Sequence, residues 1–137
     1  YEISICLVGS EMCIRDRIQP ASKNQYIQNV TNAKLDVSNT GTFETIYTAP
    51  GTTEFDFAVI ESILVGDDNG QATTIDLVVT TGSANHFLFK QKDISANGTV
   101  ELLSRDLVLK SAQSLKIQVS HANINVFVSL VEYGKGD

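Results

Sequence analysis

The sequence has no tryptophan, and its two cysteines and its single methionine all lie within the first 13 residues. Residues 18–137 therefore contain no sulfur atom, which excludes a disulfide, a thiolate metal site and a cysteine nucleophile from that part of the chain. Long hydrophobic runs are also absent, and no stretch approaches the roughly 20 apolar residues of a membrane-spanning helix. The sequence therefore predicts a soluble domain with no membrane partner.

The first residues have an unusual origin. Residues 7–17 resemble a translated sequencing adapter of the kind used for shotgun libraries, so residues 1–17 are interpreted as an adapter-derived artefact and the natural sequence is expected from Ile18. Such a junction indicates a metagenomic source. Removing the segment, with its two arginines and three acidic residues, changes the net charge from -6 to -5. A mildly acidic domain does not attract a phosphate backbone, so a nucleic-acid partner is not expected.

From Thr42 onward the pattern is one of short strands separated by turn residues, with no helical period. The expected strands are residues 42–48, 54–65, 73–81, 86–90, 100–103, 107–110, 115–119 and 124–132. Seven or eight strands at this spacing predict an all-β fold, an antiparallel β-sandwich of immunoglobulin-like or jelly-roll type. The strand order cannot be read from the pattern. Residues 42–133 are the predicted sandwich, 18–41 an N-terminal arm or an edge strand, and 134–137 a tail.

The two C-terminal strands show the clearest alternation. We expect their inward residues to form the centre of the core: Leu115, Ile117, Val119, Ile124, Val126, Val128 and Leu130. The second strand changes phase between Val59 and Ile60, which indicates a β-bulge there or burial on both faces.

Few residues suggest chemistry. His86 and His121 lack the spacing of a metal pair, and we expect both at the surface. Asp67, Asp68 and Asn69 offer oxygen atoms without the alternating spacing of a calcium loop, and Asn69-Gly70 is a strong signal for a tight hairpin. No nucleophile-elbow motif is present. The sequence predicts no catalytic residue, no metal site and no cofactor.

More informative is an excess of apolar residues on strand positions that should face water. The expected interface residues are Val78, Leu88, Phe127 and Val131. Each lies on the outward phase of a strand whose other phase already supplies a core, and few charged residues separate them. A contiguous apolar patch of this kind marks a partner surface, so we expect the four side chains to form one interface.

Five segments resemble a family of small virion structural proteins of tailed bacteriophages. They are Glu44–Gly51, which contains Tyr-Thr-Ala-Pro, then Val59–Val65, Thr73–Val79, Ile94–Leu103 and Leu115–Val119. The similarity covers about residues 42–132.

The resemblance implies a non-enzymatic structural subunit, such as a capsid decoration protein or a neck or tail component, on the exterior of the particle. It implies capsid or tail proteins as partners and a homo-oligomer, with a trimer favoured. The alternative is a receptor- or glycan-binding module of a phage fibre or a bacterial surface protein. Glycan sites usually present exposed aromatic rings, and beyond residue 17 the chain has no tryptophan and only three tyrosines, Tyr26, Tyr47 and Tyr133.

Overall fold

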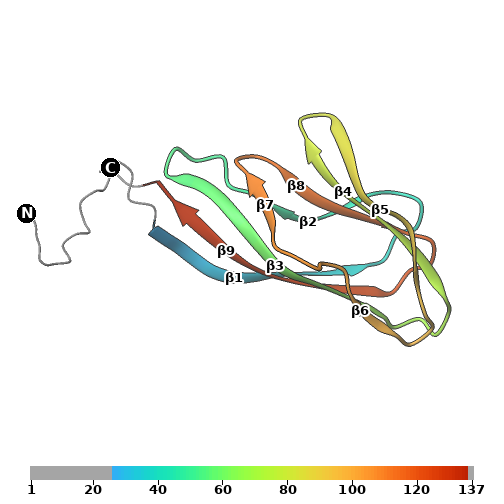
Figure 1. Ribbon diagram of the computed structural model, residues 1–137. Coiled ribbons are helices and arrows are strands. Elements are labelled where there is room, and N and C mark those ends of the chain that lie inside the picture. The colour runs from blue at the N-terminus through green and yellow to red at the C-terminus, as the bar shows by residue number, and fades with distance from the viewer. Residues whose placement is uncertain (1–25, 136–137) are drawn as a thin grey trace, which may run out of the picture.

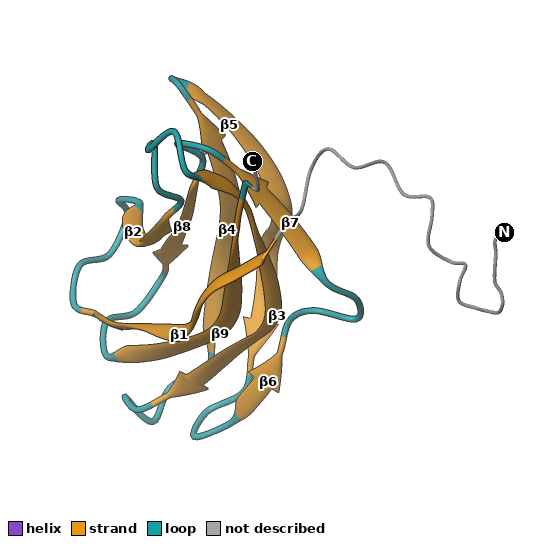
Figure 2. Cartoon of the chain, turned by 90° about the vertical axis from the view of Figure 1, so that its left-hand side faces the viewer, coloured by secondary structure: helices purple, strands orange, loops and turns teal. Residues whose placement is uncertain are grey.

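A computed structural model describes residues 26–135, which form nine strands in two packed antiparallel sheets (Figure 1). Sheet A contains β1 (Tyr26–Val37), β3 (Phe55–Asp67), β6 (Thr99–Glu101), β7 (Leu107–Lys110) and β9 (Ile124–Gly134). Sheet B contains β2 (Glu44–Thr48), β4 (Thr73–Thr81), β5 (Ala84–Ile94) and β8 (Ser114–Val119). Figure 2 shows only strands and loops in the part described. The predicted all-β sandwich is confirmed.

The pairing of strands identifies the type of sandwich. β1 pairs with β9, β2 with β8, β3 with both β6 and β7, and β4 with β5. The chain is thus one long nested hairpin, folded so that the sheet orders are β1-β9-β3-β6 and β2-β8-β4-β5. This is the strand order of a jelly roll, in which β6 and β7 are two pieces of one interrupted strand. The eight strands of the jelly roll therefore count as nine.

The limits of the sandwich differ from those expected. β1 pairs with β9 from Tyr26 to Val37, so the described sandwich begins at Tyr26 rather than at Thr42. At the other end, Gly134 still belongs to β9 and only Lys135 follows it among the described residues. The adapter-like segment and residues 18–25 lie outside the described residues. Of the two alternatives given for residues 18–41, an arm or an edge strand, the described part, residues 26–37, forms an edge strand.

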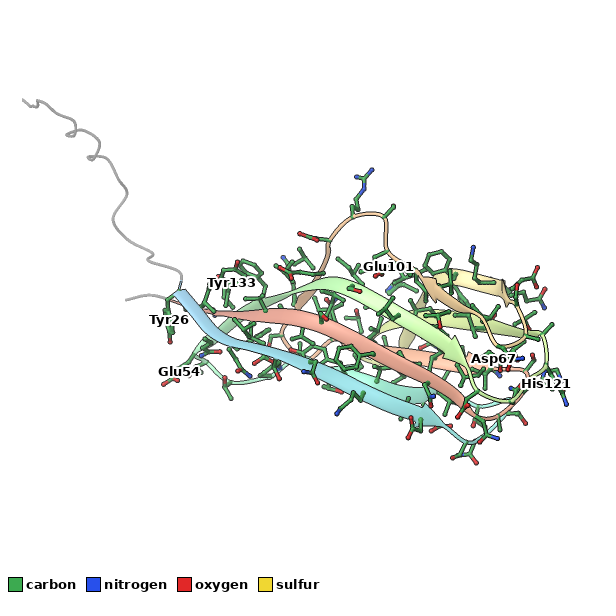
Figure 3. The ribbon with its side chains drawn as sticks, turned by 90° about the horizontal axis from the view of Figure 1, so that it is seen from below. Tyr26, Glu54, Asp67, Glu101, His121 and Tyr133 are labelled. Carbon is green, nitrogen blue, oxygen red and sulfur yellow. The ribbon has the colours of Figure 1, made fainter. Side chains whose placement is uncertain are left out.

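The prediction of a β-hairpin at Asn69-Gly70 is wrong, because the strands before and after it, β3 and β4, belong to different sheets. The turn carries the chain from sheet A to sheet B. The two carboxylate oxygens of Asp67 accept hydrogen bonds from the backbone N–H groups of Asn69 (2.9 Å) and Asn97 (2.8 Å). Gly70 supplies the left-handed conformation, with φ of +78°. The Asp67 side chain therefore connects two loops at one end of the sandwich, where Figure 3 labels it.

The core lies between the two sheets and contains the residues expected from the alternation of the C-terminal strands. All seven predicted residues from Leu115 to Leu130 are buried, and the two strands face each other because β8 belongs to sheet B and β9 to sheet A. In β3 a bulge between Ile60 and Ser62 shifts the inward phase, so that Ile60 and Ile63 both point into the core. The change of phase read from the sequence is therefore a bulge at Glu61.

One hydrogen bond joins the sheets at the side where β2 and β9 approach. The Tyr47 hydroxyl donates to the Glu132 carboxylate at 2.5 Å, and the Asn29 side-chain amide donates to the other oxygen of that carboxylate at 3.4 Å. Burial raises the pKa of Tyr47 far above its usual value, and the bonded, negatively charged Glu132 raises it further. Tyr47 therefore stays a neutral donor at any ordinary pH. None of the described residues form a helix that could cross a membrane.

The central position of β8 and β9 predicts a large effect of truncation. Ile117→Ala or Val128→Ala should lower the free energy of unfolding by about 2–4 kcal/mol, because each change leaves a cavity between the sheets in addition to the lost transfer energy. Urea denaturation followed by far-ultraviolet circular dichroism measures the change. Val108→Ala, at an exposed valine of β7, serves as the control and should cost less than about 0.5 kcal/mol.

Candidate interaction surface

The outer face of sheet A is unusually apolar. Side chains directly opposite each other on antiparallel strands point to the same face, so the register gives the rows that cross the sheet. One row contains Val30 of β1, Val131 of β9, Val59 of β3 and Val108 of β7. We call these four residues the valine row. Its central members are half-buried, whereas Val30 is 71% and Val108 51% exposed.

A second apolar row crosses the same face nearer the end at which β9 finishes. It contains Ile27, Tyr133 and Phe57, and its position on β7 is occupied by Lys110. The rings of Phe57 and Tyr133 stack at a centroid distance of 4.8 Å and an angle of 19°. Figure 3 shows Tyr133 at this end of the sheet, opposite the end that carries Asp67. The valine row and the stacked rings thus form one continuous apolar region over four strands.

Toward the Asp67 end, a polar row of Asn32, Ser129 and Ser62 follows the valine row. The row beyond it contains Lys34, Phe127 and Leu64. Phe127 and Leu64 are both 39% exposed, and they line a shallow hollow of about 310 Å³. Gly66 lies in the same hollow, and a side chain placed there would contact the Thr99 hydroxyl. The absence of a side chain at Gly66 therefore keeps this depression open beside two exposed apolar groups.

The structure does not unite the four predicted interface residues. Phe127 and Val131 project from the outer face of sheet A, whereas Val78 and Leu88 belong to sheet B. The expectation of a single patch is therefore wrong. The two surfaces lie in different layers of the sandwich. The alternation of residues along a single strand does not show to which sheet that strand belongs.

Val78 is also wrong as a surface residue, because its side chain is completely buried. The register places it beside Phe87 and Lys116 on the outer face of sheet B. The ring of Phe87 packs edge-on against Phe43 at a centroid distance of 6.2 Å, and the Lys90 ammonium lies 5.2 Å from the centre of the same ring. Neighbouring side chains thus cover Val78. The prediction that Val78 points away from the core was correct, but its side chain is not exposed to solvent.

Leu88 is 37% exposed on the edge strand β5. The register skips it, since Leu77 pairs with Phe89 and Val78 with Phe87, so Leu88 occupies a bulge. With Phe89, Leu102, Leu103 and Leu107 it lines a second hollow, of about 280 Å³, between β5 and the loop joining β6 to β7. Leu88 therefore belongs to the open side of the sandwich and not to the face that carries Phe127.

Glu101 explains why the sixth strand of the jelly roll is interrupted. Its carboxylate accepts hydrogen bonds from the Ser62 hydroxyl and from the backbone N–H groups of Ile63 (2.8 Å) and Leu103 (3.1 Å). It thereby bonds to β3 immediately after the bulge at Glu61. Burial acts to raise the pKa of Glu101, but the three hydrogen bonds outweigh it and hold the pKa below its usual value.

The structure shows no chemical role for the two histidines considered as candidate site residues. His86 and His121 are exposed as expected. The Ser120 hydroxyl lies 3.2 Å from His121 Nδ1, but it also accepts the Thr74 N–H at 2.9 Å. Within residues 26–135 no three His, Cys, Asp or Glu side chains are grouped as a metal site would require.

A polar hollow of about 350 Å³ lies on the outer face of sheet B, lined in part by Asp76, Gln91 and Gln118. The Asp76 carboxylate accepts the Gln91 N–H at 2.6 Å, which stabilises the left-handed conformation of Gln91 in a second bulge of β5. Sequence reasoning missed this hollow, because its residues come from three strands and an interstrand loop.

No protein-family model matches the chain, and no curated protein matches its sequence. Two crystal structures of a pentameric capsid protein isolated from metagenomic phage sequences share 23% identity with it, at a TM-score of 0.41. The alignments cover 72% of this chain and 59% or 60% of the other, so the chain spans less than two thirds of that protein. A structure of infectious bursal disease virus, Gx strain, has 10% identity and a TM-score of 0.39, over 96% of this chain and 42% of the other. Our fold assignment depends on the strand order and not on these distant similarities.

The hydrogen bonds of Glu101 predict a pH-dependent contribution to stability. A carboxyl group with a lowered pKa in the folded state stabilises the protein above its unfolded pKa of about 4.3, and this stabilisation is lost as the pH falls through the folded value. Glu101→Gln should therefore lower the free energy of unfolding at pH 7, and its difference from wild type should shrink as the pH falls below about 4.

Urea unfolding of both proteins from pH 7 to pH 3 measures this difference. Glu61→Gln removes the same charge from an exposed residue of the same region and should change stability at pH 7 by less than about 0.5 kcal/mol. An equal loss for Glu101→Gln at pH 3 and pH 7 would contradict the role assigned to its ionised carboxylate.

Proposed function

We propose that this protein is a non-enzymatic structural subunit of a bacteriophage virion, a capsid decoration protein or a neck or tail component. It binds capsid or tail proteins through the outer face of sheet A. The observation that carries the proposal is the apolar surface on that face, which consists of the stacked rings with the valine row and, beyond the polar row of Ser129, of Phe127 with Leu64. A sheet face directed at water normally carries polar side chains.

The energetics of this face favour association. Apolar surface exposed to water costs roughly 25 cal/mol for each Å², and stable specific interfaces bury about 800 Å² on each partner. Phe127 and Leu64, beside the hollow at Gly66, have the form of an interface centre, in which an aromatic anchor adjoins a depression that a partner side chain fills. Val131 lies on the same face of β9, two rows away, with Ser129 in the row between.

The framework suits a rigid building block. Two sheets packed over one core hold the outer face of sheet A in a fixed shape, so binding orders little of the protein. Jelly rolls occur in viral capsids but also in lectins and cupins, so the fold alone does not decide the role. The resemblance to small virion proteins of tailed phages adds a second, independent reason for a virion role. We further propose a trimer on the exterior of the particle.

A glycan-binding module is the second candidate, and the polar hollow on sheet B favours it. The side-chain amides of Gln91 and Gln118 line that hollow without a hydrogen-bond partner among the described residues. Phe87 occupies a neighbouring row of the same face, and the ring of Phe43 contacts it. Amides beside aromatic rings suit sugar hydroxyls and the apolar faces of sugar rings. Binding to a glycan array that is lost on Gln118→Ala would support this candidate over a purely structural role.

Phe127→Asp should abolish addition of the purified protein to phage particles and should dissociate the proposed trimer, because it places a charge at the centre of the apolar contact. The fold should persist, since Phe127 lies outside the core. Co-sedimentation with particles and analytical ultracentrifugation measure the two effects.

Leu88→Asp is the matched control. It introduces the same charge at a side chain of similar exposure in the other sheet, and it should leave particle binding and oligomeric state unchanged. Unimpaired binding by Phe127→Asp, together with a monomeric wild-type protein, would reject the proposed interface.

A further inference from the structure

β1 has one edge on which no strand of the described structure is hydrogen-bonded. β9 pairs with the other edge along the full length of β1. Eight successive residues of β1, from Tyr26 to Ala33, contain no charge, no proline and no glycine. Val30 lies in this run and is the most exposed large hydrophobic side chain among the described residues. An uncharged edge with unpaired N–H and C=O groups is a template for another strand.

The second long edge strand, β5, differs in just these respects. It contains two irregularities of register, at Leu88 and near Gln91, and its C-terminal half carries Lys90, Lys92 and Asp93. Bulges and charged side chains are the usual devices that prevent one sheet edge from pairing with another. The fold therefore protects the β5 edge of sheet B and leaves the β1 edge of sheet A unprotected. In β1 the single irregularity lies at Gln28, and the pairing is regular from Asn29 to Val37.

We propose that the free edge of β1 pairs with β1 of a second copy of this chain, antiparallel, about a two-fold axis at Val30. This inference concerns the sheet edge and does not depend on the virion role. A two-fold axis that relates antiparallel strands is perpendicular to the sheet, so outward residues meet outward residues and the axis passes through a residue position. Among such positions, Val30 is the one that continues the valine row.

Pairing at Val30 joins the valine rows of both copies into one row of eight side chains across a single ten-stranded sheet. It removes from water the valine that the monomer exposes most. The neighbouring cross-pairs join Asn29 of one copy to Thr31 of the other, and residues 27–33 around the axis carry no charge, so no like charges meet there. The second copy is favoured over an unrelated strand because its own β1 supplies both a free edge and a valine row that ends at that edge.

The test is a scan of single cysteines in the full chain, after Cys6 and Cys13 are changed to serine. Asn29, Val30, Thr31 and Asn32 are each replaced by cysteine, the proteins are oxidised with copper phenanthroline, and disulfide-linked dimer is measured on non-reducing gels. Only a residue at the two-fold axis lies opposite itself, so Val30→Cys should give the most dimer, at least about fivefold above its neighbours. His86→Cys, on the protected edge of β5, should give only background.

Equal yields at all four positions, or a yield at Val30→Cys no greater than at His86→Cys, would overturn the pairing. A maximum at Asn32→Cys would overturn the register centred on Val30. Repeating Val30→Cys with Phe127→Asp separates this contact from the proposed function: crosslinking should persist when particle binding is lost. In a second readout, Val30→Lys should weaken self-association by at least tenfold in ultracentrifugation at an unchanged unfolding midpoint; unchanged self-association would overturn the proposal.

Discussion

The rest of the structure depends on β3, which is apolar on both of its faces. Ile60 and Ile63 point into the core, while Phe57 and Val59 support the outer face of sheet A. The strand pairs with β9 on one side and with β6 and β7 on the other, so it holds the centre of its sheet. The bulge at Glu61 changes the phase in the middle of the strand, and the Glu101 carboxylate bonds to the backbone immediately after it. A single strand thus organises the core, the outer surface and the interruption of the sixth strand.

The two sheets divide the surface into regions of different chemistry. The outer face of sheet A carries the valine row, the stacked rings and Phe127, whereas that of sheet B carries Lys116, Gln118 and Asp76 around a polar hollow. The edges differ in the same way, since β5 has bulges and lysines and β1 has an uncharged run. Apolar surface is therefore concentrated on one sheet and one edge. Such a distribution suits a protein whose contacts with neighbours are made in fixed directions.

Much of the fold could be predicted because alternation along a strand is a local property. The inward residues of β8 and β9 and the change of phase in β3 were recognisable from spacing alone, whereas the choice between a bulge and burial on both faces was not. The errors arose where the structure depends on contacts between segments that are distant in the sequence. The Asp67–Gly70 turn was recognised. Whether β3 and β4, the strands on either side of it, pair with each other depends on distant strands, because β3 pairs with β9 in one sheet and β4 pairs with β8 in the other. Likewise, the covering of Val78 by Phe87 and Phe43 depends on registers that bring together three strands and a loop.

The sequence by itself determined the all-β class, the strand segments and the faces of its C-terminal strands, because side chains alternate with a period of two whatever the neighbours are. It also determined the outward phase of Phe127 and Val131. Only the tertiary structure decided that the sandwich is a jelly roll, that Val78 and Leu88 lie in the other sheet, and that four valines from four strands form one row. Those relations are set by strand pairing between segments up to about a hundred residues apart, for which the free energy of the whole core, rather than any local preference, selects the partner.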